Sequence, residues 1–98
     1  MHKKLGDVAN QLLFENERVK VWQMDLAPGE SSDFHEHTLP YVLYIQEGET
    51  VDADFENGKS IRIPVEPGKV FFVEPGGRET AVNRSAVRFR EFLIELKS

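Results

Sequence analysis

Short β-type runs separated by glycine-containing turns constrain the fold of this chain more than any other feature. The turn signals are Ala27-Pro28-Gly29, Glu47-Gly48, Asn57-Gly58, Pro67-Gly68 and Pro75-Gly76-Gly77. Runs rich in aromatic and β-branched residues predict strands at 19–26, 41–46, 51–55, 60–65, 70–73 and 86–96. Asn-Gly between two such runs is a strong hairpin signal. The pattern therefore predicts an all-β sandwich or barrel.

Composition narrows the class of protein. The chain has 98 residues, which predicts one domain spanning 1–98. Its net charge is −5 and it has no basic run, so we expect no nucleic-acid partner. The absence of cysteine excludes a disulfide scaffold, a thiolate zinc site and a cysteine nucleophile, and it fits a cytoplasmic location. No apolar stretch reaches the length of a membrane span, so we expect no membrane partner.

The N-terminal residues 1–14 leave two alternatives open, and we expect the barrel itself to span 18–96. Five apolar residues lie there at helical spacing, which is compatible with a short helix or with an extended arm; they are Leu5, Val8, Ala9, Leu12 and Leu13. Farther along, Pro64 falls inside a strand-like run. Proline cannot donate to a sheet ladder, so this position predicts an edge, a bulge or a strand end.

Two histidines, His35 and His37, lie two residues apart in a β-type segment. Residues i and i+2 of a strand point to the same face, with their bases roughly 6–7 Å apart. Both imidazoles can therefore reach one ion at about 2.0–2.1 Å. Two histidines alone do not make a strong metal site, so further ligands must come from elsewhere in the chain.

Two spaced motifs contain these residues. The first is Gly29-x5-His35-x-His37-x3-Tyr41-x6-Gly48, and the second is Gly68-x5-Glu74-Pro75-Gly76-x2-Glu79-x3-Asn83. They resemble the two conserved motifs of the cupin superfamily, and the resemblance covers about residues 18–96. It implies a small single-domain antiparallel jelly-roll β-barrel with six to eight strands. It also implies a divalent metal held by three histidines and one glutamate, and a homodimer.

The departures from the family pattern decide the expected ligands. His35 and His37 match the two histidines of the first motif, Tyr41 stands at the glutamate position, and Glu79 stands at the third histidine position. We therefore expect His35, His37 and Glu79 as ligands of Fe, Mn, Zn or Ni, a donor set that suits several of these ions. Tyr41 is the candidate catalytic residue, as a hydrogen-bond donor or acid. A phenolate ligand is less favoured, because an unperturbed phenol titrates near pH ~10.

Each residue also has a structural interpretation. Glu79 can be a solvated loop carboxylate, and Asn83 is interpreted as structural. Arg78, Arg88 and Arg90 are interpreted as surface charge rather than as a cation for a substrate carboxylate. If the register holds past Pro40, Tyr41 faces inward with Leu43 and Ile45. The strands 70–73 and 86–96 carry apolar residues on both faces, which also favours a homodimer.

Two functions follow from these expectations. The first is a metal-dependent enzyme, dioxygenase-like or isomerase-like, that acts on a small organic molecule inside the barrel. The second is a metal-free ligand-binding or regulatory module without catalytic activity. The retained histidine pair favours the first, and the altered ligand positions favour the second.

Overall fold

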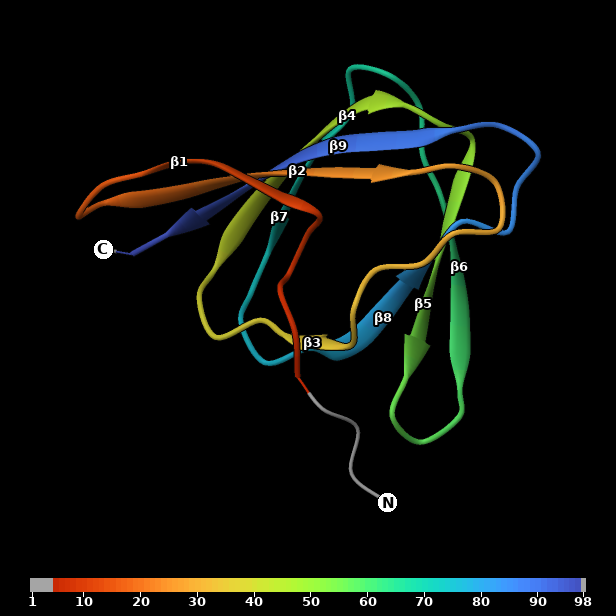
Figure 1. The fold of residues 1–98 in the computed structure, drawn as a ribbon, viewed down its shortest axis with the longest axis horizontal. Helices are drawn as coiled ribbons and strands as arrows, with labels where there is room; N and C mark the ends of the chain where they lie inside the picture. Colours follow the sequence, from red (N-terminus) through yellow and green to blue (C-terminus); the bar gives the residue numbers. More distant parts are fainter. Residues whose placement is uncertain (1–4, 98) are drawn as a thin grey trace.

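The computed structural model describes residues 5–97, which form two antiparallel sheets facing each other (Figure 1). The strands are β1 (Gln11–Glu15), β2 (Val19–Leu26), β3 (His35–Glu36), β4 (Tyr41–Glu47), β5 (Thr50–Phe55), β6 (Ser60–Pro64), β7 (Val70–Val73), β8 (Arg78–Val82) and β9 (Phe89–Leu96). One sheet has the order β1-β2-β9-β4-β7, and the other β3-β8-β5-β6. The expected all-β class is confirmed. None of the described residues belongs to a helix that could cross a membrane.

The observed strands follow the predicted ones closely where the side chains are apolar. β2 and β7 have the predicted bounds, and β4 and β5 are each one residue longer. Asn57-Gly58 lies in a hairpin loop between β5 and β6, where Gly58 has a φ of +88° and its N–H donates to Phe55 O. Glycine accepts this left-handed conformation without strain. Pro64 ends β6, which is an edge strand, as its ring predicted.

The N-terminal segment is extended, so the helical alternative is wrong. The N–H of Gly6 donates to Phe34 O at 2.7 Å, and the N–H of Asn10 donates to Gln23 O at 3.1 Å. These backbone groups are bonded to other segments of the chain rather than to a helical turn of their own. Residues 11–15 pair with β2 as β1, at the edge of the five-stranded sheet. Residues 1–4 of the expected arm lie outside the described residues.

The hydrophobic core lies between the two sheets. Met24, Leu26, Ile45, Phe89 and Leu93 are each 1–2% exposed. They alternate along β2, β4 and β9 with residues of the other face, as strand geometry requires. Burying a side chain of this size contributes roughly 1.5–3 kcal/mol. The core therefore fixes the register of the strands that carry the cavity lining.

The outer face of the five-stranded sheet is also rich in apolar side chains. Strand register places one set of them side by side on this face, across all five strands: Phe14, Val19, Val21, Val42, Tyr44, Val70, Phe72, Phe92, Ile94 and Leu96. Four of them are large and exposed, with Phe72 at 60%, Val70 at 58%, Phe14 at 54% and Tyr44 at 43%. We call this set the outer apolar face.

Candidate metal centre

Strand pairing brings two of the three predicted ligands together. β3 pairs with β8, and His35 lies directly opposite Glu79. Opposite residues of an antiparallel pair project to the same face, with Cβ atoms about 4.5–5.5 Å apart. The pairing continues past β3, because the N–H of His37 donates to Gly77 O at 2.8 Å and His37 O accepts from Gly76 N at 2.8 Å. His37 therefore follows His35 onto the face that carries Glu79.

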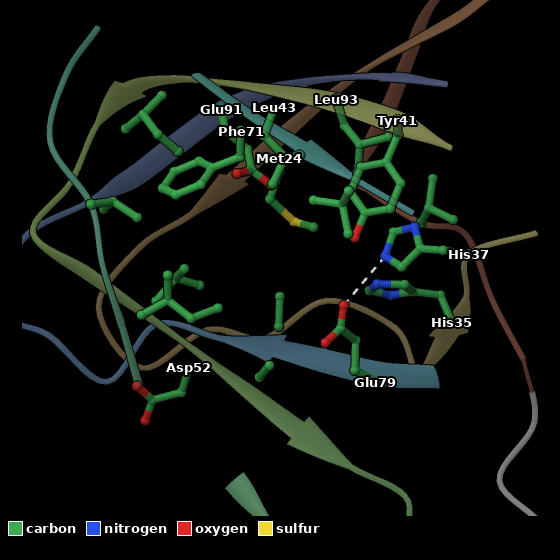
Figure 2. A pocket seen from close by; sticks show the side chains of 18 of the residues that line it. Met24, His35, His37, Tyr41, Leu43, Asp52, Phe71, Glu79, Glu91 and Leu93 are labelled. Carbon is green, nitrogen blue, oxygen red and sulfur yellow. Dashed lines mark ion pairs between the residues drawn. The ribbon is translucent and has the colours of Figure 1, made fainter. Parts of the chain in front are cut away.

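The three side chains converge on one point. Ligand atoms of His35, His37 and Glu79 all lie within 4.8 Å of one another. Nε2 of His37 is 3.4 Å from Oε1 of Glu79, and Figure 2 shows Glu79 pointing at the histidine rings from β8. Two ligands of a tetrahedral ion at about 2.0–2.1 Å lie about 3.3 Å apart. The group is therefore compact enough to close on one ion with small side-chain movements.

The surroundings of His35 favour its use as a ligand. Nδ1 lies 2.8 Å from Asp33 O, and a carbonyl oxygen can only accept, so Nδ1 carries the proton. Nε2 is then a free lone pair, and this fixing of the tautomer is typical of metal-binding histidines. His35 is 2% exposed, and burial lowers its pKa, partly offset by the hydrogen bond to Asp33. The neutral imidazole, the form that binds metals, is thereby favoured.

His37 is equally buried and has an unused nitrogen. It is 2% exposed, and its Nδ1 makes no hydrogen bond to any of residues 5–97. Its ring meets that of His35 edge to face at a centroid distance of 4.7 Å and stacks on Tyr41 at 4.1 Å. A buried polar atom without a partner is uncommon in proteins. An ion or ligand bound in the cavity would give this ring a partner that residues 5–97 themselves do not supply.

Tyr41 lies beside the three donors as a neutral phenol. It is 5% exposed and begins β4. Burial raises the pKa of its hydroxyl well above the usual value, and the nearby Glu79 raises it further. A phenol held in this state can donate a hydrogen bond. The sequence analysis favoured this role for Tyr41, a hydrogen-bond donor rather than a metal ligand.

The donors lie at one end of a cavity of about 270 Å³ between the sheets (Figure 2). Its wall is mostly apolar, with side chains from both sheets; among them are Met24, Leu43, Ile45, Ile63, Phe71 and Leu93. As predicted, Tyr41, Leu43 and Ile45 all line the interior. A small organic molecule with a few polar groups fits a cavity of this character.

Sequence reasoning did not single out two further acids of the lining, Asp52 and Glu91. Asp52 accepts hydrogen bonds from Arg62 and Arg84, and these arginines lower its pKa. Glu91 lies between Phe89 and Leu93 on β9. Because Phe89 and Leu93 share a face, simple alternation along the strand would have identified Glu91 as an inward acid.

The remaining polar candidates have structural roles. Arg78 pairs with Glu36 and Glu56, and both Arg88 and Arg90 lie beside Asp25. None of the three arginines lines the cavity.

Asn83 is fully buried. Its Nδ2 donates to Leu26 O at 2.9 Å and to Val87 O at 2.8 Å, while its Oδ1 accepts from Ser85. It therefore ties the loop before β9 to β2, as its structural interpretation predicted.

Comparison with known proteins identifies the fold. No family model matches the sequence, and no curated protein matches it. Among solved structures, a cupin domain from Bordetella pertussis Tohama I is 24% identical, with a TM-score of 0.79, and the match covers 95% of this chain and 100% of that chain. A cupin superfamily protein from Desulfitobacterium hafniense DCB-2 is 19% identical, with a TM-score of 0.66 and coverages of 100% and 84%.

A third similar structure is a conserved protein with a double-stranded β-helix domain from Klebsiella pneumoniae. It is 16% identical, with a TM-score of 0.69, and the match covers 95% of this chain and 83% of that chain. At such identities the likeness establishes the architecture and leaves activity to the residues of the site. The two facing sheets, the interior cavity and these matches together show that the chain is a small protein of the cupin fold.

Proposed function

We propose that this protein holds a divalent first-row metal ion with His35, His37 and Glu79 and binds a small organic molecule in the cavity beside it. The observation that carries the proposal is the convergence of three donors from paired segments, one with its tautomer set by a backbone carbonyl. Two imidazoles and a carboxylate suit zinc or non-haem iron, and manganese or nickel also accept these donors.

The ion, Tyr41 and the apolar wall would each have a separate role in this site. An ion at this position supplies Lewis-acid chemistry to an oxygen of the bound molecule. Tyr41, stacked on His37, presents a neutral hydroxyl that can donate a hydrogen bond or a proton to that molecule. The apolar wall would exclude water from the same space. These roles describe a metal-dependent enzyme whose reaction is not named by the fold.

A metal-free binding module is the second candidate. The observation that favours it is Tyr41 itself, because a neutral phenol stands where the cupin motif carries a glutamate ligand. The cavity keeps its shape and apolar wall in either case. A protein of this kind would bind its ligand through the wall and the polar groups alone.

Metal content separates the two candidates. Tag-free protein purified without nickel is analysed by elemental analysis, beside the variants Glu79→Ala and Glu74→Ala. Glu74 is an exposed acid just before the same turn, so it matches the charge change without touching the site. We expect near-stoichiometric metal in the wild type and in Glu74→Ala, and loss in Glu79→Ala. Wild-type protein without metal after reconstitution would favour the binding module.

We also propose that the outer apolar face joins two copies of this chain. It is a broad sheet face with several large side chains more than 40% exposed, and such patches on small proteins mark interaction sites. A twofold pairing of the same face is the commonest way to cover one, because each copy supplies the complementary surface.

Light scattering tests the homodimer. We expect a dimer for the wild type, a monomer for Phe72→Glu, and a dimer for Val87→Glu, since Val87 is exposed but lies outside the sheets. A wild-type monomer across the concentration range would contradict the assignment.

A further inference from the structure

Glu91 is a buried acid at a different end of the cavity from the histidines. It lies on β9, is 6% exposed and lines the cavity. Figure 2 shows its carboxyl group among Met24, Leu43 and Phe71, away from the His35–His37 pair. The proposed metal centre uses none of these residues, so Glu91 has no role in it.

The carboxyl group of Glu91 has no partner in the part of the chain that the structure describes. The other inward acids each have one: Trp22 Nε1 donates to Glu95 at 2.6 Å, and Asp52 is bound by two arginines. The hydrogen bond that Gln23 Nε2 donates to Glu91, at 3.0 Å, goes to the backbone oxygen and not to the carboxyl group. A buried carboxyl group that lacks a hydrogen-bond partner destabilises the fold, so its presence on an apolar wall calls for a reason.

The surroundings determine the form in which this carboxyl group exists. Burial, together with a smaller contribution from the negative charge of Glu79, raises the pKa of Glu91 to about 8. No cation lines the cavity within residues 5–97. Glu91 is then mainly neutral at pH 7, and a neutral carboxyl group is a hydrogen-bond donor as well as an acceptor.

We propose that Glu91 donates a hydrogen bond to a carbonyl or hydroxyl oxygen of a small, otherwise apolar ligand, and so determines which ligands the cavity accepts. The ligand would fill about 270 Å³ between the two polar ends. The placement of the other end of this ligand at the metal rests on the proposed function. The contact between the ligand and Glu91 does not depend on a metal. The class of ligand is a neutral oxygenated molecule rather than an amine, because an amine is protonated at pH 7 and an ammonium group cannot accept the hydrogen bond that a neutral acid donates.

Three small molecules test this inference in metal-free protein. Cyclohexanone and methylenecyclohexane differ only in having oxygen or a CH₂ group at one position, and cyclohexylamine carries a cation instead. Dissociation constants are measured for the wild type, Glu91→Leu, Glu91→Gln and the matched control Glu95→Gln. Glu95 is also a buried acid on β9, but it does not line the cavity.

We expect the preference for the ketone over the alkene to fall by about 5- to 100-fold in Glu91→Leu, the range for one lost hydrogen bond with a buried partner. The Glu91→Gln variant still has a hydrogen-bond donor at position 91, and the Glu95→Gln variant still has Glu91 itself. Both variants should therefore retain the preference for the ketone. The infrared carbonyl stretch of bound cyclohexanone should lie at lower frequency in the wild type than in Glu91→Leu.

Three results would overturn the inference. They are a wild type that does not bind cyclohexanone, a preference unchanged in Glu91→Leu, and tightest binding of cyclohexylamine. Because the infrared signature is read in the wild type itself, a variant that fails to fold does not remove the test. Because no metal is present, failure here is distinguishable from failure of the metal centre, which elemental analysis measures.

Discussion

The two polar ends of the cavity are built in different ways. At one end, His35, His37 and Glu79 come from paired segments, and backbone pairing forces their side chains together. At the other end, Glu91 stands alone among apolar residues, and only the alternation of β9 points it inward. The first end gains its chemistry from several groups acting on one point. The Glu91 end gains its chemistry from the apolar environment, which changes the protonation state of this single carboxyl group.

The sharpest test of the first end is removal of a histidine. His35→Ala deletes one of three donors whose ligand atoms lie within 4.8 Å of one another. Structural zinc sites of zinc-finger peptides bind the ion with about 10–16 kcal/mol. On that scale one of three donors accounts for roughly a third, about 3–5 kcal/mol, so we expect its loss to weaken binding by roughly 1,000-fold. Competition with a chelator of known affinity measures the change. Unchanged affinity would remove His35 from the site.

The raised pKa of Glu91, at the second end, predicts that the stability of the fold depends on pH. The pKa of Glu91 rises from 4.5 to about 8 on folding, so between these values the native state keeps a proton that the unfolded state releases. The unfolded state binds fewer protons, and the free energy of unfolding falls as pH rises through this window. At 1.36 kcal/mol per unit, the loss amounts to about 3–5 kcal/mol by pH 8.

Glu91→Gln removes this titration while keeping the size of the side chain. Urea denaturation from pH 5 to pH 8 should therefore show a wild type that loses stability relative to the variant as pH rises. Parallel curves for the two proteins would mean that Glu91 is ionised in the folded state. The Glu91 end would then resemble the metal end in carrying charge, and the contrast between them would disappear.

The smallest expected effect concerns Tyr41, which borders the metal end without belonging to its ligands. Tyr41→Phe keeps the ring stacked on His37 and removes only the hydroxyl. Because the raised pKa of this hydroxyl keeps it protonated, we expect metal affinity to change by less than about threefold, corresponding to under 1 kcal/mol. A tyrosinate absorption band on adding metal to the wild type would show instead that Tyr41 is a ligand.

The same contrast explains how much the sequence could predict. Spaced motifs singled out His35, His37 and Glu79, whose donor atoms the fold brings together, and apolar runs predicted the bounds of β2 and β7. β8 was not predicted, because its residues 78–82 are mostly polar and follow Pro75-Gly76-Gly77, a sequence typical of a loop.

β1 was missed because the apolar residues up to Leu13 lie at helical spacing and residues 12–14 are consecutive rather than alternating. Glu91 belongs to no motif, and its protonation depends on neighbours from other strands. Only the folded chain shows that no cation among residues 5–97 lines the cavity beside it.

Diffraction from crystals soaked in zinc tests the central claim most directly. The account predicts an anomalous difference peak between the imidazoles of His35 and His37 and the carboxylate of Glu79, about 2.0–2.2 Å from each ligand atom. A peak confined to exposed acids such as Glu74, or no peak inside the barrel, would contradict it.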